Sequence, residues 1–422
     1  MEGPDKVNLV AAITLIFARI TYAINWFNIA SIFSHIASDF KQDISLLGLI
    51  TASFFVGLGV FQVPGGILAA KHGARKTAIY GITIASSATL FCGVSMQLQQ
   101  IEILRFIVGL GMAFFFGPSV TLITRYLGKG HEGVGVGLLN SAHSVGGIIG
   151  LFGWVIIAEI IGWRYSLVLS GILGLVSSLL LVIALPRKQE KEPDRHFEIK
   201  VSDISKVLFD KSLFGFGLVL LGAQIAWGLT LTFMVFYLED SLKISSTMAG
   251  LVGSLSLIFA IAAAPIFGRI YDRIRNVKKL LFICGIAMSI SVAAIAITNR
   301  YSSLYIVLIP TVLVGVFSAG VFTIAYTVAK EAYRIRIKNE ESCIQGRKRK
   351  TINHNHDHPL SEYDTLSISW INGLSLFGAF WVPIVFSFIV HHLGYAVAWL
   401  LGGIISILFV LPSTLRIKRY RV

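Results

Sequence analysis

Two arginines lie inside long apolar stretches of the sequence, where a charged side chain requires an explanation. Arg19 lies well inside the stretch 8–34, and Arg105 lies in the stretch 101–126. If these stretches cross a membrane, an ionisable group within them is costly and usually faces a cavity or a partner. A guanidinium presents a planar fork of N–H donors that matches a carboxylate or a phosphate. The two residues therefore predict a positive pole that binds an anion.

Aromatic and polar side chains accompany these charges at helical spacing. Arg19, Tyr22 and Trp26 share one helix face, and Asn140 shares a face with His143 in another segment. The second half of the chain offers neutral groups, which orient a ligand by hydrogen bonding and stacking. The predicted substrate-binding residues are Arg19, Tyr22, Trp26, Arg105, Asn140, His143, Gln224, Trp227, Tyr326, Trp370 and Asn372.

Structural roles are open alternatives for some of these residues. Arg105 can pair with Glu102, one turn away, or with backbone carbonyl groups. His143 can be a hydrogen-bonded residue at a helix contact, and the polar strip over 369–375 can serve hydrogen bonds between helices. Arg19 has no acid at helical spacing, so a purely structural role explains it least well.

The composition supports a membrane protein. Of the 422 residues, 55% are hydrophobic and 14% are charged, whereas a soluble domain usually has about 25% charged residues. An ordinary soluble enzyme and a disordered chain are therefore excluded. The apolar stretches contain no nucleophile–base pair and no cluster of metal ligands, and three cysteines make no disulfide framework. The sequence predicts neither an enzyme nor a bound metal or cofactor.

Twelve stretches are long and apolar enough to cross a bilayer, which takes roughly 20 residues. The sequence therefore predicts an all-α membrane protein with twelve transmembrane helices. Because the N-terminal segment lacks the pattern of a cleaved signal peptide, we expect the first helix to be retained. The stretches cover about residues 8–34, 44–70, 77–98, 101–126, 133–160, 163–185, 213–238, 246–270, 278–298, 302–329, 363–390 and 394–414.

The lysines and arginines predict the orientation. With the N-terminus inside, 30 of the 36 basic residues fall on the cytoplasmic side, 4 fall outside and 2 lie within the spans. This asymmetry predicts that both termini are cytoplasmic, with the protein in the plasma membrane. It also explains the net charge of +14 by contact with lipid headgroups, without a nucleic-acid partner.

Acidic residues are scarce inside the predicted spans. Of the 22 acids, we place only Glu102 and Glu159 within them, both toward the outer ends. On a regular helix, Glu159 lies about 160° around the axis from His143, so we expect it outside the site. A coupling proton would therefore ride on His143, because a free imidazole has a pKa of about 6.5, or on the substrate itself.

A polar segment divides the spans into two groups of six. We predict an N-terminal six-helix half over 1–186, a cytoplasmic linker over 187–211 and a C-terminal half over 212–422. Two basic segments 202 residues apart echo each other, as in a six-helix unit used twice. A cytoplasmic insertion over 331–362 interrupts the second half, and its first part is expected to continue the preceding helix.

Three alternating histidines lie in this insertion. His354, His356 and His358 would face one side of an extended strand, which suits a metal ion. No further ligand fixes a coordination geometry. The alternative is a solvated loop, which we favour.

The segments that follow the second and eighth spans resemble a loop motif of the major facilitator superfamily. In the first copy, Ala70 stands where the family usually has aspartate, and Arg105 with Gly109 resembles the family's arginine–glycine motif in its fourth helix. The expected gating residues that match the loop motif are Gly66, Lys71, Gly73 and Arg75 in the first copy and Gly268, Asp272 and Arg273 in the second.

The resemblance implies two six-helix halves whose first and fourth helices line a central cavity. It also implies that the loops lock the inside-closed arrangement through charge and helix-dipole contacts. Since Ala70 lacks the acid, Asp272 would carry the remaining lock. The alternative is that both loops anchor basic residues at the membrane surface. The fifth helix lacks the proline of the family's antiporter motif, so that version is not supported.

These observations predict a secondary active transporter that moves a small organic anion, such as a carboxylate, by alternating access. The partners are a small-molecule substrate, the lipid bilayer and, if transport is coupled, a proton. Uniport and anion exchange are open alternatives to coupling. One alternative is efflux of amphipathic cations or drugs, which would need a buried carboxylate in the cavity. Another is a receptor without transport that signals through the segment 331–362.

Overall fold

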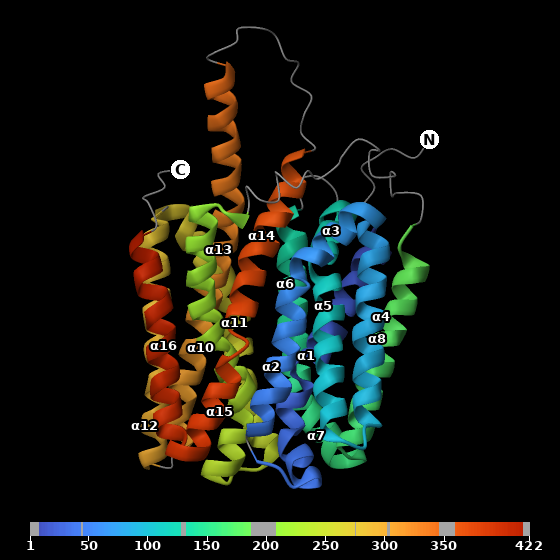
Figure 1. The fold of residues 1–422 in the computed structure, drawn as a ribbon, viewed down its shortest axis with the longest axis vertical. Helices are drawn as coiled ribbons and strands as arrows, with labels where there is room; N and C mark the ends of the chain where they lie inside the picture. The colour runs from blue at the N-terminus through green and yellow to red at the C-terminus, as the bar shows by residue number, and fades with distance from the viewer. Residues whose placement is uncertain are drawn as a thin grey trace.

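The chain folds into a bundle of helices that run along one axis (Figure 1). No strand occurs among the residues that the structure describes. Most of the predicted linker and the three insertion histidines lie outside those residues. The computed structural model describes residues 8–43, 45–127, 132–186, 208–274, 276–301, 304–345 and 359–416.

Helical boundaries follow the predicted apolar stretches closely. The first part of the chain forms α1 (Leu9–Phe40), α2 (Ser45–Val60), α3 (Gln62–His72), α4 (Ala74–Gly93), α5 (Leu98–Leu127), α6 (Glu132–Ile148), the π-helical turn η1 (Ile149–Gly153), α7 (Trp154–Ile161) and α8 (Trp163–Ala184). The second part forms α10 (Lys211–Leu242), α11 (Ser246–Ile274), α12 (Val277–Tyr301), α13 (Leu304–Gln345), α14 (Pro359–Gly378), α15 (Val382–Leu393) and α16 (Tyr395–Arg416).

Eleven helical stretches of the described chain are long and apolar enough to span a membrane. In lipid a helix satisfies its backbone polar groups internally, so the structure confirms an all-helical, multi-pass membrane protein. The predicted third stretch is α4, which is not among the eleven. Its Arg75, Lys76 and several Ser and Thr residues lower its hydropathy. The count of twelve spans therefore stays a prediction.

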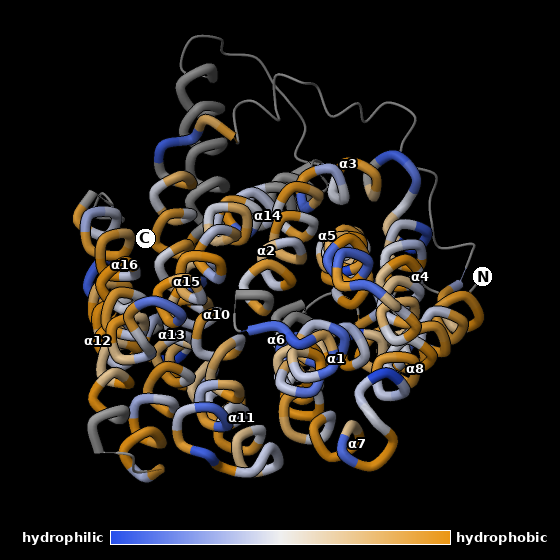
Figure 2. The backbone as a smooth tube through the Cα atoms, turned by 60° about the horizontal axis from the view of Figure 1, so that its bottom comes forward, coloured by the Kyte–Doolittle hydropathy of each residue, from blue (hydrophilic) through white to orange (hydrophobic). Residues whose placement is uncertain are grey.

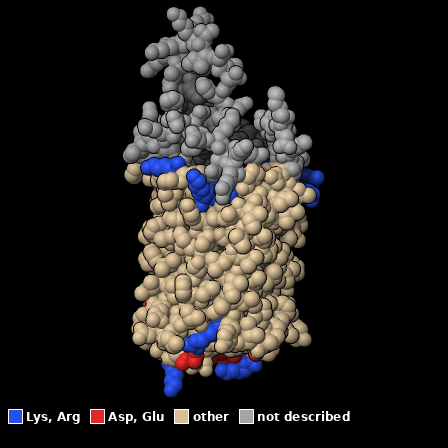
Figure 3. Space-filling view, turned by 90° about the vertical axis from the view of Figure 1, so that its right-hand side faces the viewer, with Lys and Arg blue, Asp and Glu red and all other residues tan. Residues whose placement is uncertain are grey.

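The surface has the polarity that a bilayer requires. Hydrophobic residues predominate along the helices and hydrophilic residues at their connections (Figure 2). On the face drawn in Figure 3, Lys and Arg gather near the two ends, with an uncharged band between them. Large apolar side chains such as Tyr80, Ile160 and Leu408 are exposed, as expected where lipid tails replace water.

Contacts define the two ends of the bundle. The N–H of Asn8, before α1, donates to the carbonyl of Tyr126 in α5 at 2.9 Å. At the other end, Arg164 in the first turn of α8 pairs with Asp39 in the last turn of α1. We call the end where α1 begins the inner end and the opposite one the outer end, after the predicted orientation.

Three of the membrane stretches are interrupted. A break at Phe61 separates α2 from α3, and Pro64 lies in the first turn of α3. A second break, between Gly378 and Val382, separates α14 from α15, whose first turn contains Pro383. Proline removes a backbone donor and cannot continue a preceding helix. The third interruption is η1, whose wider turn adds one residue to the helix.

Glycines bring α2 and α5 into backbone contact. A Cβ added at Gly57 would lie 2.1 Å from the carbonyl oxygen of Phe106, and one added at Gly109 would lie 2.2 Å from that of Phe54. Membrane helices associate by such close packing at small residues. The glycine of the predicted arginine–glycine motif therefore serves this helix contact.

One helix extends far beyond the membrane stretch. α13 has 42 residues, whereas its apolar span ends at Val328. The expectation that the insertion begins as a continuation of the preceding helix is confirmed, and Figure 1 shows this helix projecting from the inner end.

Candidate functional site

Arg19 is a buried cation without an ion-pair partner among the described residues. Its side chain is 5% exposed, and the guanidinium carbon lies 4.3 Å from the ring centroid of Tyr22 and 4.9 Å from that of Phe116. These rings attract a cation through their negative faces but supply no anion. Its Nη1 has no hydrogen-bond partner in the described part of the chain, so this N–H group can serve a ligand.

Arg105, in contrast, binds the backbone of α1. Its Nη1 donates to the carbonyl of Asn25 at 2.8 Å and its Nη2 to that of Trp26 at 3.2 Å. The guanidinium carbon lies 4.6 Å from the centroid of the Phe54 ring. This geometry matches the alternative in which Arg105 pairs with backbone carbonyl groups. No ion pair between Arg105 and Glu102 occurs among the described residues. These carbonyl groups lie six and seven residues beyond Arg19 along α1, about two helical turns, and the positive pole of two arginines stays a prediction.

His143 lies in an aromatic cluster with the first helix. The His143 ring centroid is 5.9 Å from that of Tyr22, 5.6 Å from Trp26 and 5.7 Å from Phe27. Its Nδ1 has no partner among the described residues. The structure therefore brings His143 against the Tyr22–Trp26 face of α1, a contact between helices that helical spacing does not predict.

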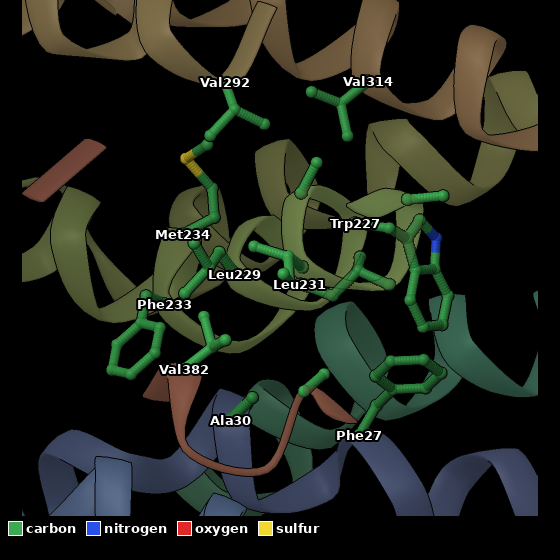
Figure 4. Close-up of a cluster of buried hydrophobic side chains, with 14 of the residues drawn as sticks. Phe27, Ala30, Trp227, Leu229, Leu231, Phe233, Met234, Val292, Val314 and Val382 are labelled. Atoms are coloured by element: carbon green, nitrogen blue, oxygen red, sulfur yellow. The ribbon is translucent and has the colours of Figure 1, made fainter. Parts of the chain in front are cut away.

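The second part of the chain completes this cluster. Trp227 of α10 lies 6.4 Å from Trp26 and 5.9 Å from Phe27, measured between ring centroids. In Figure 4, the side chains of Phe27 from α1 and Trp227 from α10 lie next to each other. Phe322 of α13 extends the cluster, 5.8 Å from Trp227. Rings from both parts of the chain thus meet at the centre of the bundle.

The predicted polar groups of the second part lie beside these rings. The Tyr326 hydroxyl donates to the side-chain oxygen of Asn372 at 2.7 Å, and Tyr326 is stacked at 6.2 Å on Phe322. Within the described residues, Gln224 Nε2 and Trp370 Nε1 are buried without a hydrogen-bond partner. Asn140, by contrast, is exposed, and the structure gives it no contact with the cluster.

The first copy of the loop motif, between α3 and α4, is held in place by Arg75, one of its predicted gating residues. Arg75 donates from Nε to the carbonyl of Leu185 at 2.9 Å and from Nη2 to that of Val182 at 2.8 Å. A cation at a helix C-terminus is favoured by the helix dipole, so Arg75 ties the start of α4 to the end of α8. Gly73 ends α3 with φ 90°, which favours glycine.

For the other expected gating residues, the structure describes no comparable hydrogen bond among the residues that it covers. Gly66 and Gly268 have open space where a side chain would be. Lys71 and Arg273 are exposed. The side chain of Asp272 lies outside the described residues, so the proposed lock in the second copy stays a prediction.

Sequence reasoning missed a set of contacts at the outer end. They join helices that we predicted to belong to opposite halves, and each involves a carboxylate. Ser34 donates to Glu239, Thr247 donates to Glu159 at 3.1 Å, and His391 Nδ1 lies 3.1 Å from Asp43. These contacts close the outer end of the interface.

The expected census of acids within the helices was wrong. α1 continues to Phe40 and α10 to Leu242, so Asp39, Glu239 and Asp240 also lie within helices at their outer ends. The polar character of these last turns made them look like connections. No described acid lies at the centre beside Arg19.

Glu159 is also rotated relative to its predicted position. One residue absorbed by η1 reduces its separation from His143 to about 60° around the axis. Consistently, both ends of this interrupted helix face α11, through Gly147 beside Leu257 and Glu159 bonded to Thr247. Glu159 remains exposed and distant along the axis from the aromatic cluster.

Gln62 is a second buried polar residue that the sequence analysis did not select. It is 2% exposed, and neither amide atom has a hydrogen-bond partner among the described residues. The available signal was an amide directly before a Val-Pro pair within an apolar span. Within the described chain, no group of three or more His, Cys, Asp or Glu residues lies together to hold a metal.

Comparison with known proteins decides the family. The family described as "Major Facilitator Superfamily" matches residues 15–336. The chain belongs to the major facilitator superfamily. Members of this superfamily are transporters, so the predicted family and the absence of enzymatic function are confirmed.

Relatives within the superfamily are distant. The chain is 25% identical over 334 residues to a probable chloroplastic anion transporter of Arabidopsis thaliana, covering 75% of this chain and 64% of that protein. It is 25% identical over 163 residues to a probable sulfoacetate transporter of Cupriavidus necator, covering 39% of this chain and 37% of that one. A riboflavin transporter of Clostridioides difficile is 20% identical over 326 residues, covering 66% and 71%. The chain thus spans less than two thirds of the first two relatives.

Solved structures of the superfamily share the fold over nearly the whole chain. A bacterial homologue of the human lysosomal transporter Spinster, inward-facing and unoccupied, has a TM-score of 0.72 at 15% identity and covers 98% of this chain and 96% of that one. The nucleoside transporter NupG has a TM-score of 0.72 at 14% identity, covering 98% and 100%. At these identities the likeness concerns the fold.

Proposed function

We propose that this superfamily member is a secondary active transporter that moves a small organic anion by alternating access. The observation that carries the proposal is the buried Arg19, whose Nη1 has no partner among the described residues. A bound carboxylate would supply the missing countercharge, and hydrogen bonds to a charged group contribute about 1.5–3 kcal/mol each. The aromatic rings of both parts of the chain would enclose the organic body of the substrate.

The remaining predicted groups have distinct roles in this proposal. Tyr22, Trp26 and Trp227 contact the substrate body, and His143 lies beside it. Gln224, Tyr326, Trp370 and Asn372 orient its polar parts. Arg105 supports the site through its bonds to the α1 backbone, and Asn140 lies toward the inner entrance.

The proposed topology is twelve spans in two halves, 1–186 and 212–422, with α4 as the twelfth span. Figure 1 shows α4 running the length of the bundle beside α5, which supports this role despite its lower hydropathy. The count of basic residues supports a plasma-membrane protein with cytoplasmic termini. In the structure, contacts such as Ser34–Glu239 close the outer end, so exchange of substrate would next occur toward the inside.

We further propose symport of a proton with the anion. No described acid lies at the centre of the bundle, which leaves His143 and the substrate carboxylate as proton carriers. The relatives support an anion in part, because two of them are described as transporters of anions or sulfoacetate. The riboflavin relative shows that family membership alone leaves the substrate open.

The experiment measures thermal stabilisation of the purified protein by organic acids. A ligand at about 100 times its Kd stabilises the folded state by about 2.7 kcal/mol. The wild type should respond to at least one monocarboxylate, Arg19→Lys more weakly because the fork is lost, and Arg19→Gln not at all. Arg164→Gln, which removes an arginine paired with Asp39 at the outer end, is the matched control and should respond like the wild type.

Two results would contradict the proposal. A response only to neutral or cationic compounds would favour the efflux alternative. Full anion affinity in Arg19→Gln would show that the anion does not bind this residue. Intact flux after deletion of residues 331–362 would instead count against the receptor alternative.

A further inference from the structure

Gln62 combines deep burial with a complete lack of partners. It is 2% exposed, and both Nε2 and Oε1 lack hydrogen-bond partners among the described residues. A primary amide carries two donors and an acceptor with two lone pairs. A buried amide without partners is destabilising, so a residue of this kind within a membrane span requires a reason.

Gln62 lies at an interruption of a membrane-spanning helical stretch. It is the first residue of α3, immediately after the break at Phe61, and it lies within the span Leu47–Ala69, seven residues from the inner end of that span. Transporters of this kind commonly form their substrate sites where membrane helices are discontinuous. Here the break is accompanied by an unsatisfied buried amide, which is an independent sign of a ligand.

A helix from the other part of the chain packs against this break. A Cβ at Gly373 of α14 would be 3.3 Å from Gln62 Cβ, and one at Gly59 of α2 would be 2.6 Å from the Phe377 nitrogen. Both Gly373 and Phe377 lie in the last two turns of α14, which ends at Gly378. The C-terminal part of α14 therefore lies directly against the α2–α3 break beside Gln62.

This junction connects to the site around Arg19. Asn372, adjacent to Gly373, accepts the hydrogen bond of Tyr326, and Tyr326 is stacked on Phe322, which extends the aromatic cluster beside Arg19. Trp370 shares a helix face with Gly373 and carries a buried Nε1 without a partner in the described chain. Three N–H donors and one carbonyl acceptor, from Gln62 and Trp370, are thus buried beside α14 without a hydrogen-bond partner among the described residues.

We propose that Gln62 is a specificity-determining substrate-binding residue that recognises a neutral oxygen group. The inference rests on the proposed function and narrows it: the substrate is a hydroxy- or oxo-carboxylate, with its carboxylate on Arg19 and its hydroxyl or carbonyl on Gln62. An uncharged amide together with an indole N–H suits a neutral oxygen. A second carboxylate would need a cation at this position, and the structure places none there among the described residues.

The test compares matched acids that differ by one hydroxyl group. Affinities are measured by calorimetry for glycolate and acetate, lactate and propionate, and 4-hydroxybenzoate and benzoate. The variant Gln62→Met keeps the length of the side chain and removes the amide. Gln99→Met makes the same chemical change at an exposed position at the outer end and is the control.

The wild type and the control should bind the hydroxylated member of at least one pair about tenfold more tightly or better, because a site built for a hydroxyl rejects its analogue. In Gln62→Met this ratio should fall to about one, with the affinity for the hydroxyl-free acid unchanged. The melting temperature of the ligand-free variant should stay equal or rise, since a buried unsatisfied amide is removed.

Three outcomes would overturn the inference. The first is a Gln62→Met variant that retains the wild-type ratio, and the second is one that weakens both members of a pair by the same factor. A lower melting temperature of the ligand-free variant, with the ratio intact, would assign Gln62 a structural role. If the wild type binds acids without a Gln62-dependent ratio, only this inference fails. If it binds none of these acids, the proposed function fails with it.

Discussion

Replacing Gly57 by alanine should drive α2 and α5 apart. An alanine Cβ at this position would lie 2.1 Å from the Phe106 carbonyl oxygen, 3.0 Å from the carbonyl carbon and 3.1 Å from the Leu110 nitrogen. Close carbon–oxygen contacts in proteins lie at about 3.3–3.6 Å, so the helices must separate by about 1.2 Å. The obstacle is helical backbone, which cannot move aside as a side chain can.

The cost follows from this displacement. A gap of about 0.5–1 Å already forfeits a quarter to a half of a dispersion contact, and overpacking costs about 1–3 kcal/mol. For Gly57→Ala we expect a loss of stability at the upper end of this range, about 3 kcal/mol, because the neighbouring Gly109 approaches Phe54 closely in the same interface. At about 2 °C per kcal/mol, the melting temperature of purified Gly57→Ala should fall by about 6 °C.

Gly66 provides a control in the same membrane stretch. No heavy atom lies within 4 Å of a Cβ added there, and alanine is a better helix former than glycine by up to about 1 kcal/mol. Gly66→Ala should therefore melt at the same temperature as the wild type or slightly higher. Equal melting temperatures for the two variants, measured in one detergent, would refute the backbone-contact reasoning.

Three further predictions address the rest of the molecule. Arg105→Gln should lower the free energy of unfolding by about 2–4 kcal/mol, since it loses two charge-assisted bonds to α1; a melting temperature equal to that of the wild type would contradict this. A cysteine pair at Ser34 and Glu239 should form a disulfide that blocks flux until it is reduced, and continued flux in the oxidised variant would show that this contact does not gate. Of single cysteines at Lys243 and Gly346 in a cysteine-free background, only the former should react with an impermeant reagent in intact cells, and labelling at Gly346 would reverse the orientation.

Periodicity predicted the parts of the site that depend on one regular helix. Arg19, Tyr22 and Trp26 share a face because α1 is uninterrupted over these residues. The helix boundaries were predictable for a similar reason, since lipid rewards long apolar stretches. The all-helical membrane fold could therefore be anticipated from the sequence, whereas the count of twelve spans and their division into two halves stay predictions.

Contacts between helices and departures from regular geometry were not predictable in this way. The partners of Arg105 are backbone carbonyls of α1, which no side-chain pattern reveals. The angular position of Glu159 changed because η1 adds a residue that a helical wheel does not contain. Gln62 stood out only once the packing of α14 against α3 showed its amide to be enclosed.

The projecting part of α13 makes the molecule's motion accessible to measurement. About 17 helical residues lie between Val328 and the end of the helix at Gln345, which corresponds to an arm of about 26 Å. If the C-terminal half rocks as a rigid body, each 10° of rotation would carry the tip through about 4–5 Å, by the same arm length. A spin label or fluorophore near the tip would then report the rotation of the C-terminal half from a position outside the detergent belt and remote from the substrate. The helix thereby converts a small tilt inside the membrane into a displacement that distance spectroscopy resolves.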